Sequence, residues 1–345
     1  MGAGRRLGVD FGTSNSAAGF HLDGKVRLIE VEPGQNPLPT AFFLDDDSRE
    51  TLLGSGANAA LLEGVEGRYM RALKRVLGTP LMHEERQILN ERVTFVEIIA
   101  RFLRHIKARA ESTTGLRFET ALSGRPVRFH SDDAARDVQA EADLRACYLA
   151  AGFQAVDFLP EPEAAAIATG LASEGRGLGL VVDIGGGTSD FSVFETGAAG
   201  QVRVIANRGV TIGGTDFDRL LSLDHVMGLL GKDAQLRREF GPGWLNAPKA
   251  GFVDLATWEK IPFQYGSKIL RAVAERQARA REPERFARLH KVIQYELGHD
   301  VAFAVENAKI SANAQAGEGA RVKLGFVEPG LGAEFGLADK DASLA

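Results

Sequence analysis

Two short stretches of the sequence combine an aspartate with glycine, threonine and serine in a pattern that could bind phosphate. The first is GVDFGTSNS, from Gly8 to Ser16, and the second is VVDIGGGTSD, from Val181 to Asp190. Glycine and small hydroxyl residues at a tight turn let backbone N–H groups approach a phosphate closely. Either stretch alone could be a structural turn, but two copies favour a pair of opposing phosphate-binding turns. The predicted phosphate-binding residues are Gly12, Thr13, Ser14, Asn15, Gly185, Gly186, Gly187 and Thr188.

Each turn follows an aspartate at the end of an apolar strand, Asp10 in the first copy and Asp183 in the second. An unpaired carboxylate in such a place is costly unless a cation or hydrogen-bond donors meet it. Mg²⁺ is usually held by one or two carboxylates together with substrate phosphates. We predict that the two aspartates hold Mg²⁺; the alternative is that each orders only its own turn. A P-loop is excluded because no lysine in the chain is followed by serine or threonine.

The elements that must position these residues are two β-hairpins. Apolar residues flank both turns, at Leu7–Phe20 and Leu180–Phe194, in a strand, turn and strand pattern. The two aspartates lie 183 − 10 = 173 residues apart, which is half of the 345-residue chain. This spacing implies a duplicated architecture of two lobes.

The rest of the chain carries strand and helix patterns. Asp132 or Asp133 could cap a helix that ends near Ala151. We also expect helices at Glu50–Gly78, Thr94–Thr113 and Glu161–Gly170, strands at Glu119–Leu122, Ala155–Leu159 and Val202–Ile205, and a mostly helical insert from Asp216 to Ser311.

The composition is that of a globular protein, with 44% hydrophobic and 25% charged residues and a formal net charge of −5. This acidic balance lacks the broad basic field that non-specific nucleic-acid binding needs, so nucleic acid is not an expected partner. No apolar run approaches the length of a membrane span, and the single cysteine, Cys147, cannot form an internal disulfide. We expect a cytoplasmic protein with no membrane partner.

Four motifs, taken in order, resemble those of DnaK-like heat-shock chaperones. They are GVDFGTSNS at Gly8–Ser16, EPEAAA at Glu161–Ala166, DIGGGTSD at Asp183–Asp190 and GGTDFD at Gly213–Asp218. The resemblance covers about residues 5–325 and is closest to the shorter YegD-type members, which have the ATPase region but no peptide-binding domain. It implies an actin-like ATPase fold that closes over ATP or ADP and Mg²⁺.

The resemblance also implies roles for further residues at matching positions. Lys74 is similar to the family lysine that orients the attacking water and stabilises charge on the γ-phosphate, although a lone lysine on a helix is ordinarily a surface residue. Glu161 matches the glutamate that helps to place water and metal, and its alternative role is a helix-start charge favoured by the dipole. Asp190 would order water or ions. The matching positions also identify four further cofactor-binding residues, Gly213, Gly214, Glu306 and Lys309. The resemblance places the last two beside the adenosine.

Two features depart from the family pattern. Ile310 stands where an arginine usually packs on the adenine base, and the chain ends before the turn that normally completes the adenosine pocket. We therefore expect an incomplete second lobe with exposed apolar faces, which would lead to self-association or local instability and to weak ATP binding.

Together these observations predict an α/β protein with the actin-like ATPase fold. Lobe I would span residues 1–175 with an inserted subdomain at about 37–117, and lobe II residues 176–345 with a helical insert at about 213–345. The predicted activity is hydrolysis of the γ-phosphate of ATP by water, in a chaperone-type ATPase domain whose partners are nucleotide and a protein client or co-chaperone. The alternatives are a nucleotide-binding switch or scaffold with little hydrolysis, an actin-like filament former, and a sugar kinase, for which we locate no catalytic aspartate or sugar pocket.

Overall fold

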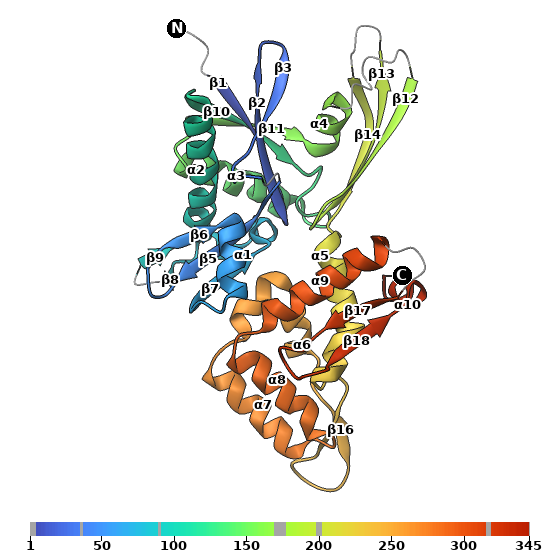
Figure 1. Cartoon of the computed structure of the whole chain (residues 1–345). Helices are drawn as coiled ribbons and strands as arrows, with labels where there is room; N and C mark the ends of the chain where they lie inside the picture. The colour runs from blue at the N-terminus through green and yellow to red at the C-terminus, as the bar shows by residue number, and fades with distance from the viewer. Residues whose placement is uncertain are drawn as a thin grey trace. The chain divides into compact units, whose positions relative to one another are not determined.

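The chain is a mixed α/β protein with several separate β-sheets, as its sequence predicts (Figure 1). The computed structural model describes residues 5–34, 37–88, 91–168, 177–197, 202–314 and 319–344. The chain divides into two compact units, Met1–Gly214 and Thr215–Ala345. The predicted lobe boundary at residues 175 and 176 lies outside the described residues, and the division into two lobes stays a prediction.

The first unit is built on a sheet that contains both parallel and antiparallel strands. These strands are β1 (Arg5–Phe11), β2 (Asn15–Leu22), β3 (Lys25–Ile29), β4 (Leu38–Pro39), β10 (Phe118–Arg125) and β11 (Ala155–Pro160). Their order is β11-β10-β1-β2-β3, and β4 also pairs with β2. β1 is parallel to β10, whereas β1 and β2 form an antiparallel hairpin around the first predicted turn. The first predicted hairpin and the strand at Glu119–Leu122 are therefore confirmed.

Two helices, α2 (Phe95–Thr114) and α3 (Ala134–Ala150), pack against each other and share a core with this sheet. Thr94 and Glu97 form a capping box at the start of α2, and the Asp133 side chain caps α3, so α3 begins at one of its two predicted caps. The shared core includes Leu7, Val9, Phe11, Ile98, Phe102, Ile106, Leu144 and Tyr148.

The segment 50–78 is not the helix that its spacing predicts. It contains β6 (Thr51–Leu53), α1 (Gly54–Leu62), β7 (Gly67–Arg71) and the 3-10 helix η1 (Leu73–Val76). β6 and β7 both pair with β5 (Ala41–Asp45), which lies earlier in the chain. The prediction was wrong because this strand pairing overrides a helical pattern that only α1 follows. The elements that come next are the 3-10 helix η2 (Pro80–His83) and the hairpin of β8 (Arg86–Ile88) and β9 (Glu91–Val93).

A second sheet of the first unit is antiparallel and carries the second predicted turn. Its strands are β12 (Gly177–Ile184), β13 (Ser189–Thr196) and β14 (Val202–Val210), in that order. The β12–β13 hairpin was predicted correctly. α4 (Glu161–Ala168) begins directly after β11, at the predicted residue, and packs against this sheet. Thr169 and Gly170, predicted to extend α4, lie outside the described residues.

The second unit is mostly helical, as predicted. Its helices are α5 (Gly214–Leu221), the π-helix η5 (Ser222–Val226), the 3-10 helices η6 (Met227–Leu230) and η7 (Trp258–Gln264), α6 (Ala250–Leu255), α7 (Ser267–Arg279), α8 (Pro283–Gln294), α9 (Gly298–Ala314) and α10 (Leu337–Leu344). Two short hairpins pair β15 (Gln235–Arg237) with β16 (Trp244–Asn246), and β17 (Ala320–Lys323) with β18 (Gly332–Phe335). The helices and β17–β18 enclose a core of their own that includes Leu230, Phe252, Phe286, Val292, Val305 and Val322.

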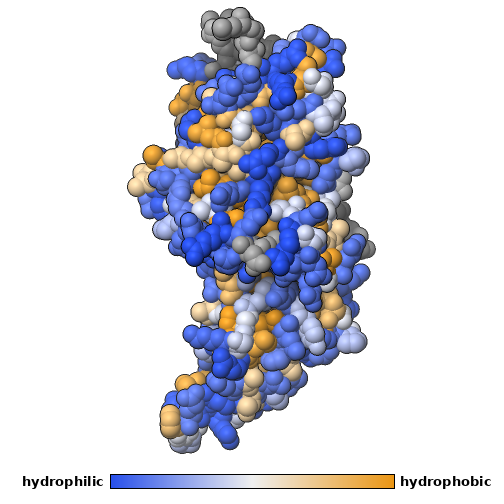
Figure 2. Space-filling view, turned by 90° about the vertical axis from the view of Figure 1, so that its left-hand side faces the viewer, coloured by the Kyte–Doolittle hydropathy of each residue, from blue (hydrophilic) through white to orange (hydrophobic). Residues whose placement is uncertain are grey.

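The surface mixes hydrophilic and apolar residues over the face that Figure 2 presents. Apolar atoms contribute a large share of any folded protein's surface, so single exposed apolar residues do not by themselves indicate a site. Among the described helices, none combines the length and the hydrophobicity that crossing a membrane requires.

Candidate functional site

A cavity of ≈ 670 Å³ in the first unit collects most of the residues that the sequence singles out. The β1–β2 turn, the β12–β13 turn, η1 and the start of α4 all contribute to its walls. Its volume falls within the range of small-molecule sites. The predicted residues that line it are Asp10, Gly12, Thr13, Ser14, Asn15, Lys74, Glu161, Asp183, Gly185, Gly186, Gly187 and Thr188.

The two glycine-rich turns lie against each other in this cavity. A Cβ atom added at Gly186 would lie 2.3 Å from Ser14 Oγ, and one added at Gly187 would lie 2.7 Å from Thr13 Oγ1. Any larger residue at either glycine would therefore require the facing Ser14 or Thr13 side chain to move. Glycine lets the two backbones meet, and it leaves their N–H groups and hydroxyls beside the cavity.

Gly213 and Gly214, predicted to contact the cofactor, are not among the lining residues but support the second turn. The Gly214 N–H donates to the Gly185 carbonyl oxygen at 2.9 Å. A Cβ atom on Gly213 would lie 2.6 Å from the Gly187 nitrogen and 2.7 Å from the Gly185 oxygen. These two glycines hold the turn at Gly185–Gly187 in shape, and their contact with a cofactor stays a prediction.

We expect Gly213→Ala to weaken the affinity for the predicted nucleotide by about tenfold or more, because overpacking must move the turn. A titration with fluorescent ADP measures this. Gly56→Ala is the matched control, because a Cβ atom there meets nothing within 4 Å. Equal affinities in the two variants would show that the turn tolerates the methyl group.

Lys74 and Glu161 form a buried ion pair in the cavity. Lys74 Nζ lies 2.8 Å from Glu161 Oε1, and the two side chains are only 8% and 19% exposed. Burial alone would lower the pKa of Lys74, but the negative charges of Glu161 and Asp10 outweigh it and raise the pKa. The ammonium group therefore stays charged, and Lys74 is not the solvent-facing helix residue that its local sequence allows.

Asp10 near the end of β1 and Asp183 near the end of β12 also line the cavity. Asp10 is exposed where it lines the cavity, yet partial desolvation by the surrounding protein raises its pKa, and the nearby Lys74 lowers it in part. The pKa of Asp183 is likewise raised, first by burial and then by the negative charge of Glu161. Among the described lining residues, three carboxyl groups thus accompany one ammonium group, an arrangement that favours a further cation.

Asp190 lies behind the cavity rather than among the residues that line it. It is the cross-strand neighbour of Asp183 and is 1% exposed. Its Oδ1 accepts the Val127 N–H at 2.9 Å, which ties β13 to the segment after β10. Burial raises the pKa of Asp190 to about 6, although the hydrogen bond from Val127 opposes this shift. Asp190 can therefore exchange a proton near neutral pH.

This raised pKa predicts that Asp190→Asn stabilises the chain more at neutral pH than in acid. Below the ordinary aspartate pKa of 3.8, the proton on Asp190 contributes its full stabilisation of the folded state. This stabilisation is lost as the pH rises through about 6. Asparagine keeps the acceptor for Val127 but carries no charge. The melting temperature of the variant minus that of the parent should rise from about pH 4 to about pH 7. Circular dichroism measures both melting temperatures. A difference that stays flat or falls with pH would contradict the raised pKa of Asp190. Asp157→Asn, at an exposed carboxylate, is the control.

Glu306 and Lys309, predicted to lie beside the adenosine, are on α9 in the second unit. Lys309 Nζ lies 2.6 Å from Oδ1 of the buried Asp218, and Trp258 Nε1 donates to Oδ2 of the same carboxylate at 3.3 Å. Burial raises the pKa of Asp218, and Lys309 partly lowers it. Lys309 therefore stabilises a buried carboxylate, and a contact with adenosine stays a prediction for both α9 residues.

Sequence reasoning missed several lining residues. Gly124 in β10 lies between two of the carboxylates, since a Cβ atom there would be in ordinary contact with Asp10 Oδ1 at 3.6 Å and with Glu161 Cγ at 3.4 Å. A glycine inside a strand often marks such a close approach and could have served as the signal. The other missed residues include Leu122, Leu159, Ala164, Ala165 and Ala168.

The donor set of the cavity suits a hard cation that binds together with phosphate. No group of three or more histidine, cysteine, aspartate or glutamate side chains is placed to hold a metal ion within the part of the chain that the structure describes. Mg²⁺ does not require such a group, because phosphate oxygens and water complete its coordination. Asp10 and Asp183, both partly desolvated, fit this requirement.

Known proteins match much of the chain. Residues 83–239 match a family model described as Hsp70 protein. The chain is 32% identical over 228 residues to the chaperone protein DnaK of Endomicrobium trichonymphae, an alignment that covers 64% of this chain and 34% of that protein. It is 34% identical over 218 residues to the chaperone protein DnaK of Thermotoga petrophila, covering 62% and 34%. A chaperone protein HscA homolog of Rickettsia akari is 30% identical over 231 residues, covering 63% and 36%. The chain thus spans about a third of the length of these relatives.

Proposed function

Because the chain is a DnaK-like member of the Hsp70 family, we propose that it is a chaperone-type ATPase domain that binds ATP or ADP with Mg²⁺ in the cavity of the first unit. The observation that carries this proposal is the contact of the two glycine-rich turns beside the buried pair of Lys74 and Glu161. A site of this kind offers N–H donors, hydroxyls and one ammonium group to a chain of phosphates.

The proposal includes the finer features that the resemblance implies. These are an actin-like fold of two lobes with one phosphate-binding hairpin each, an ATPase region similar to that of the YegD-type members, and a cytoplasmic location. The proposed partners are a protein client or a co-chaperone, as befits the chaperones that the chain resembles. Glu306 and Lys309 would contribute to the adenosine site.

The two turns would bind the phosphates through their backbone N–H groups and through the hydroxyls of Thr13 and Thr188. Asp10 and Asp183 would hold the hydrated Mg²⁺, whose charge neutralises phosphate oxygens. The excess of carboxylates in the cavity supports this assignment, since a divalent cation offsets their repulsion.

Hydrolysis would depend mainly on positioning and charge, because phosphoryl transfer needs little covalent chemistry from the protein. The Lys74 ammonium would stabilise the negative charge that develops on the γ-phosphate as water attacks. Glu161, which holds this ammonium, would orient the water. Asp190, with a pKa of about 6, would order water or ions behind the hairpin.

Single-turnover release of phosphate from γ-labelled ATP tests the proposal. We expect release that requires Mg²⁺ and that exceeds the rate in buffer. Binding of nucleotide without release of phosphate would favour the alternative of a nucleotide-binding switch or scaffold. Release of phosphate accompanied by nucleotide-dependent pelleting would favour a filament former. A chain that does not bind nucleotide and does not release phosphate would reject the proposal.

We also propose that two copies of the chain self-associate through the exposed apolar face of the β12–β14 sheet. Leu180 and Val193 are cross-strand neighbours, as are Val182 and Phe191, so all four side chains lie on one face. They are exposed, Leu180 by 61%. A contiguous apolar patch of this kind is typical of an interaction surface.

Leu180→Lys should weaken this association by about tenfold, because a charged side chain would have to be desolvated at the interface. Sedimentation velocity over a concentration series measures the effect. Val26→Lys replaces an apolar residue on β3 that is 75% exposed and is the control. A parent chain that stays monomeric throughout the series would refute the proposal.

A further inference from the structure

Lys74 lies in a short segment that begins with a residue in an unfavourable backbone conformation. Ala72, just before η1, is fully buried and adopts the left-handed conformation with φ 61°, and Gly78, just after it, has φ 75°. A non-glycine residue in this conformation is unfavourable and persists only where its surroundings hold it. The contacts around this segment therefore decide where the lysine lies.

The peptide bond between Leu77 and Gly78 is held at both of its polar ends. The Gly78 N–H donates to Asp143 Oδ2 at 2.8 Å. The Leu77 carbonyl oxygen accepts a hydrogen bond from His130 Nε2 at 2.7 Å. Leu77, which supplies this carbonyl, also donates its own N–H to the Lys74 carbonyl oxygen at 3.4 Å, so the held peptide adjoins the bond that closes the turn bearing Lys74.

Asp143 is well placed to act as an anchor. It lies on α3, is 1% exposed, and its second oxygen accepts hydrogen bonds from Gln139 Nε2 at 2.7 Å and from His83 Nε2 at 2.9 Å. Gly78 also approaches the helix so closely that an added Cβ atom would lie 2.4 Å from the Arg136 carbonyl oxygen. The segment is thus seated directly on α3.

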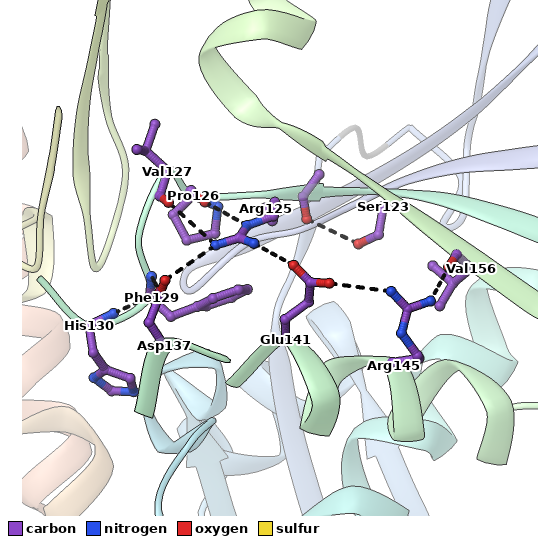
Figure 3. A network of polar contacts seen from close by, with 11 residues as sticks. Ser123, Arg125, Pro126, Val127, Phe129, His130, Asp137, Glu141, Arg145 and Val156 are labelled. Carbon is purple, nitrogen blue, oxygen red and sulfur yellow. Dashed lines mark hydrogen bonds and ion pairs between the residues drawn. The ribbon is translucent and has the colours of Figure 1, made fainter. Parts of the chain in front are cut away.

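His130 is itself fixed by the same helix. Asp137 Oδ1 accepts hydrogen bonds from the backbone N–H groups of Phe129 at 2.6 Å and of His130 at 3.4 Å (Figure 3). Arg125, which contacts Asp137 and Glu141, adds a further link between this segment and α3. The clamp formed by Asp143 and His130 is therefore anchored to α3 on both sides, which fixes the position of Lys74 relative to this helix.

We propose that Asp143 and His130 are positioning residues for Lys74. They hold the Leu77–Gly78 peptide on α3, and through it they keep the lysine in its ion pair with Glu161. The effect of this positioning on ATP hydrolysis rests on the proposed function, whereas its effect on where Lys74 lies does not. The clamp sets where the ammonium lies and leaves the phosphate-binding turns untouched.

The first test follows the accessibility of Lys74 without any nucleotide. Acetylation of Lys74 is quantified by mass spectrometry, with the exposed Lys25 as internal reference. We expect Asp143→Leu and His130→Ala to raise the rate by about tenfold, because the segment opens locally. Asp143→Asn and His130→Gln keep an acceptor and a donor, respectively, and should restore much of the protection.

Asp133→Ala is the matched control, because it removes the cap of α3 without touching the clamped peptide. Unchanged acetylation in His130→Ala, whose side chain is only partly buried and whose loss the fold should tolerate, would overturn the proposal. So would an equal rise in the Asp133→Ala control, since the effect would then reflect general loosening of α3.

The second test uses single-turnover hydrolysis. Asp143→Leu should slow hydrolysis by about 10- to 100-fold while ADP affinity changes little, because misplacement of the lysine affects the transition state more than binding. In a Lys74→Ala background the same substitution should have almost no further effect. Full additivity of the two would overturn the proposal. A parent without hydrolysis would instead count against the proposed ATPase, and acetylation would still decide the role of the clamp.

Discussion

Lys74→Ala should lose most ATP hydrolysis while keeping most of its affinity for ADP. The lysine is buried and charged and is held by Glu161 in the cavity, so it can stabilise charge that appears only as the γ-phosphate is transferred. Loss of such a group typically costs about 100-fold or more in turnover. Single-turnover phosphate release gives the rate, and titration with ADP gives the affinity.

Lys25→Ala, at an exposed lysine of β3, is the control and should match the parent in both measurements. Unchanged single-turnover hydrolysis in Lys74→Ala, with an active parent, would make Lys74 a structural residue that merely neutralises Glu161. A large loss of ADP affinity with turnover preserved would also contradict the assignment, because it would place the lysine on ground-state phosphates instead.

The second large effect concerns the two aspartates of the hairpins. Asp10→Asn and Asp183→Asn should each weaken the Mg²⁺-dependent affinity for nucleotide by about 10- to 100-fold. Both carboxylates line the same cavity and would hold one hydrated ion, so the double variant should lose less than the sum of the two single losses. Titrations with ADP at a series of Mg²⁺ concentrations measure these affinities.

Titration in EDTA provides an internal control with the opposite sign. Without a cation, each substitution removes a negative charge that repels the phosphates, so affinity should rise or stay the same. Asp157→Asn, at an exposed carboxylate on β11, should change neither titration. Variants that retain the Mg²⁺ dependence of the parent would show that Asp10 and Asp183 only order their own turns.

The parts of the fold and site that sequence could predict are those encoded in consecutive residues. Both hairpins, with Asp10 and Asp183 near their strand ends, follow from runs of apolar residues interrupted by glycine and hydroxyl residues. The start of α4 at Glu161 and the cap of α3 by Asp133 are likewise local signals. Chemistry that lies in one stretch of chain leaves a pattern that can be read without the fold.

The parts that sequence could not predict depend on contacts between distant residues. Lys74 is buried because β7 pairs with β5 and because Asp143, on another element, holds the peptide of Gly78. The supporting role of Gly213 appears only once the loop is seated on the Gly185–Gly187 turn. Nothing in the local spacing of these residues carries that information.

The most direct test of the central claim is a calorimetric titration of the full chain with ADP, in the presence of Mg²⁺ and again in EDTA. The claim is that the two touching turns and their carboxylates form one Mg²⁺-nucleotide site. We predict saturable binding of one ADP per chain that weakens when Mg²⁺ is removed and that Gly213→Ala diminishes. Binding that is absent in both conditions, or that is equally strong in both and indifferent to Gly213→Ala, would contradict it.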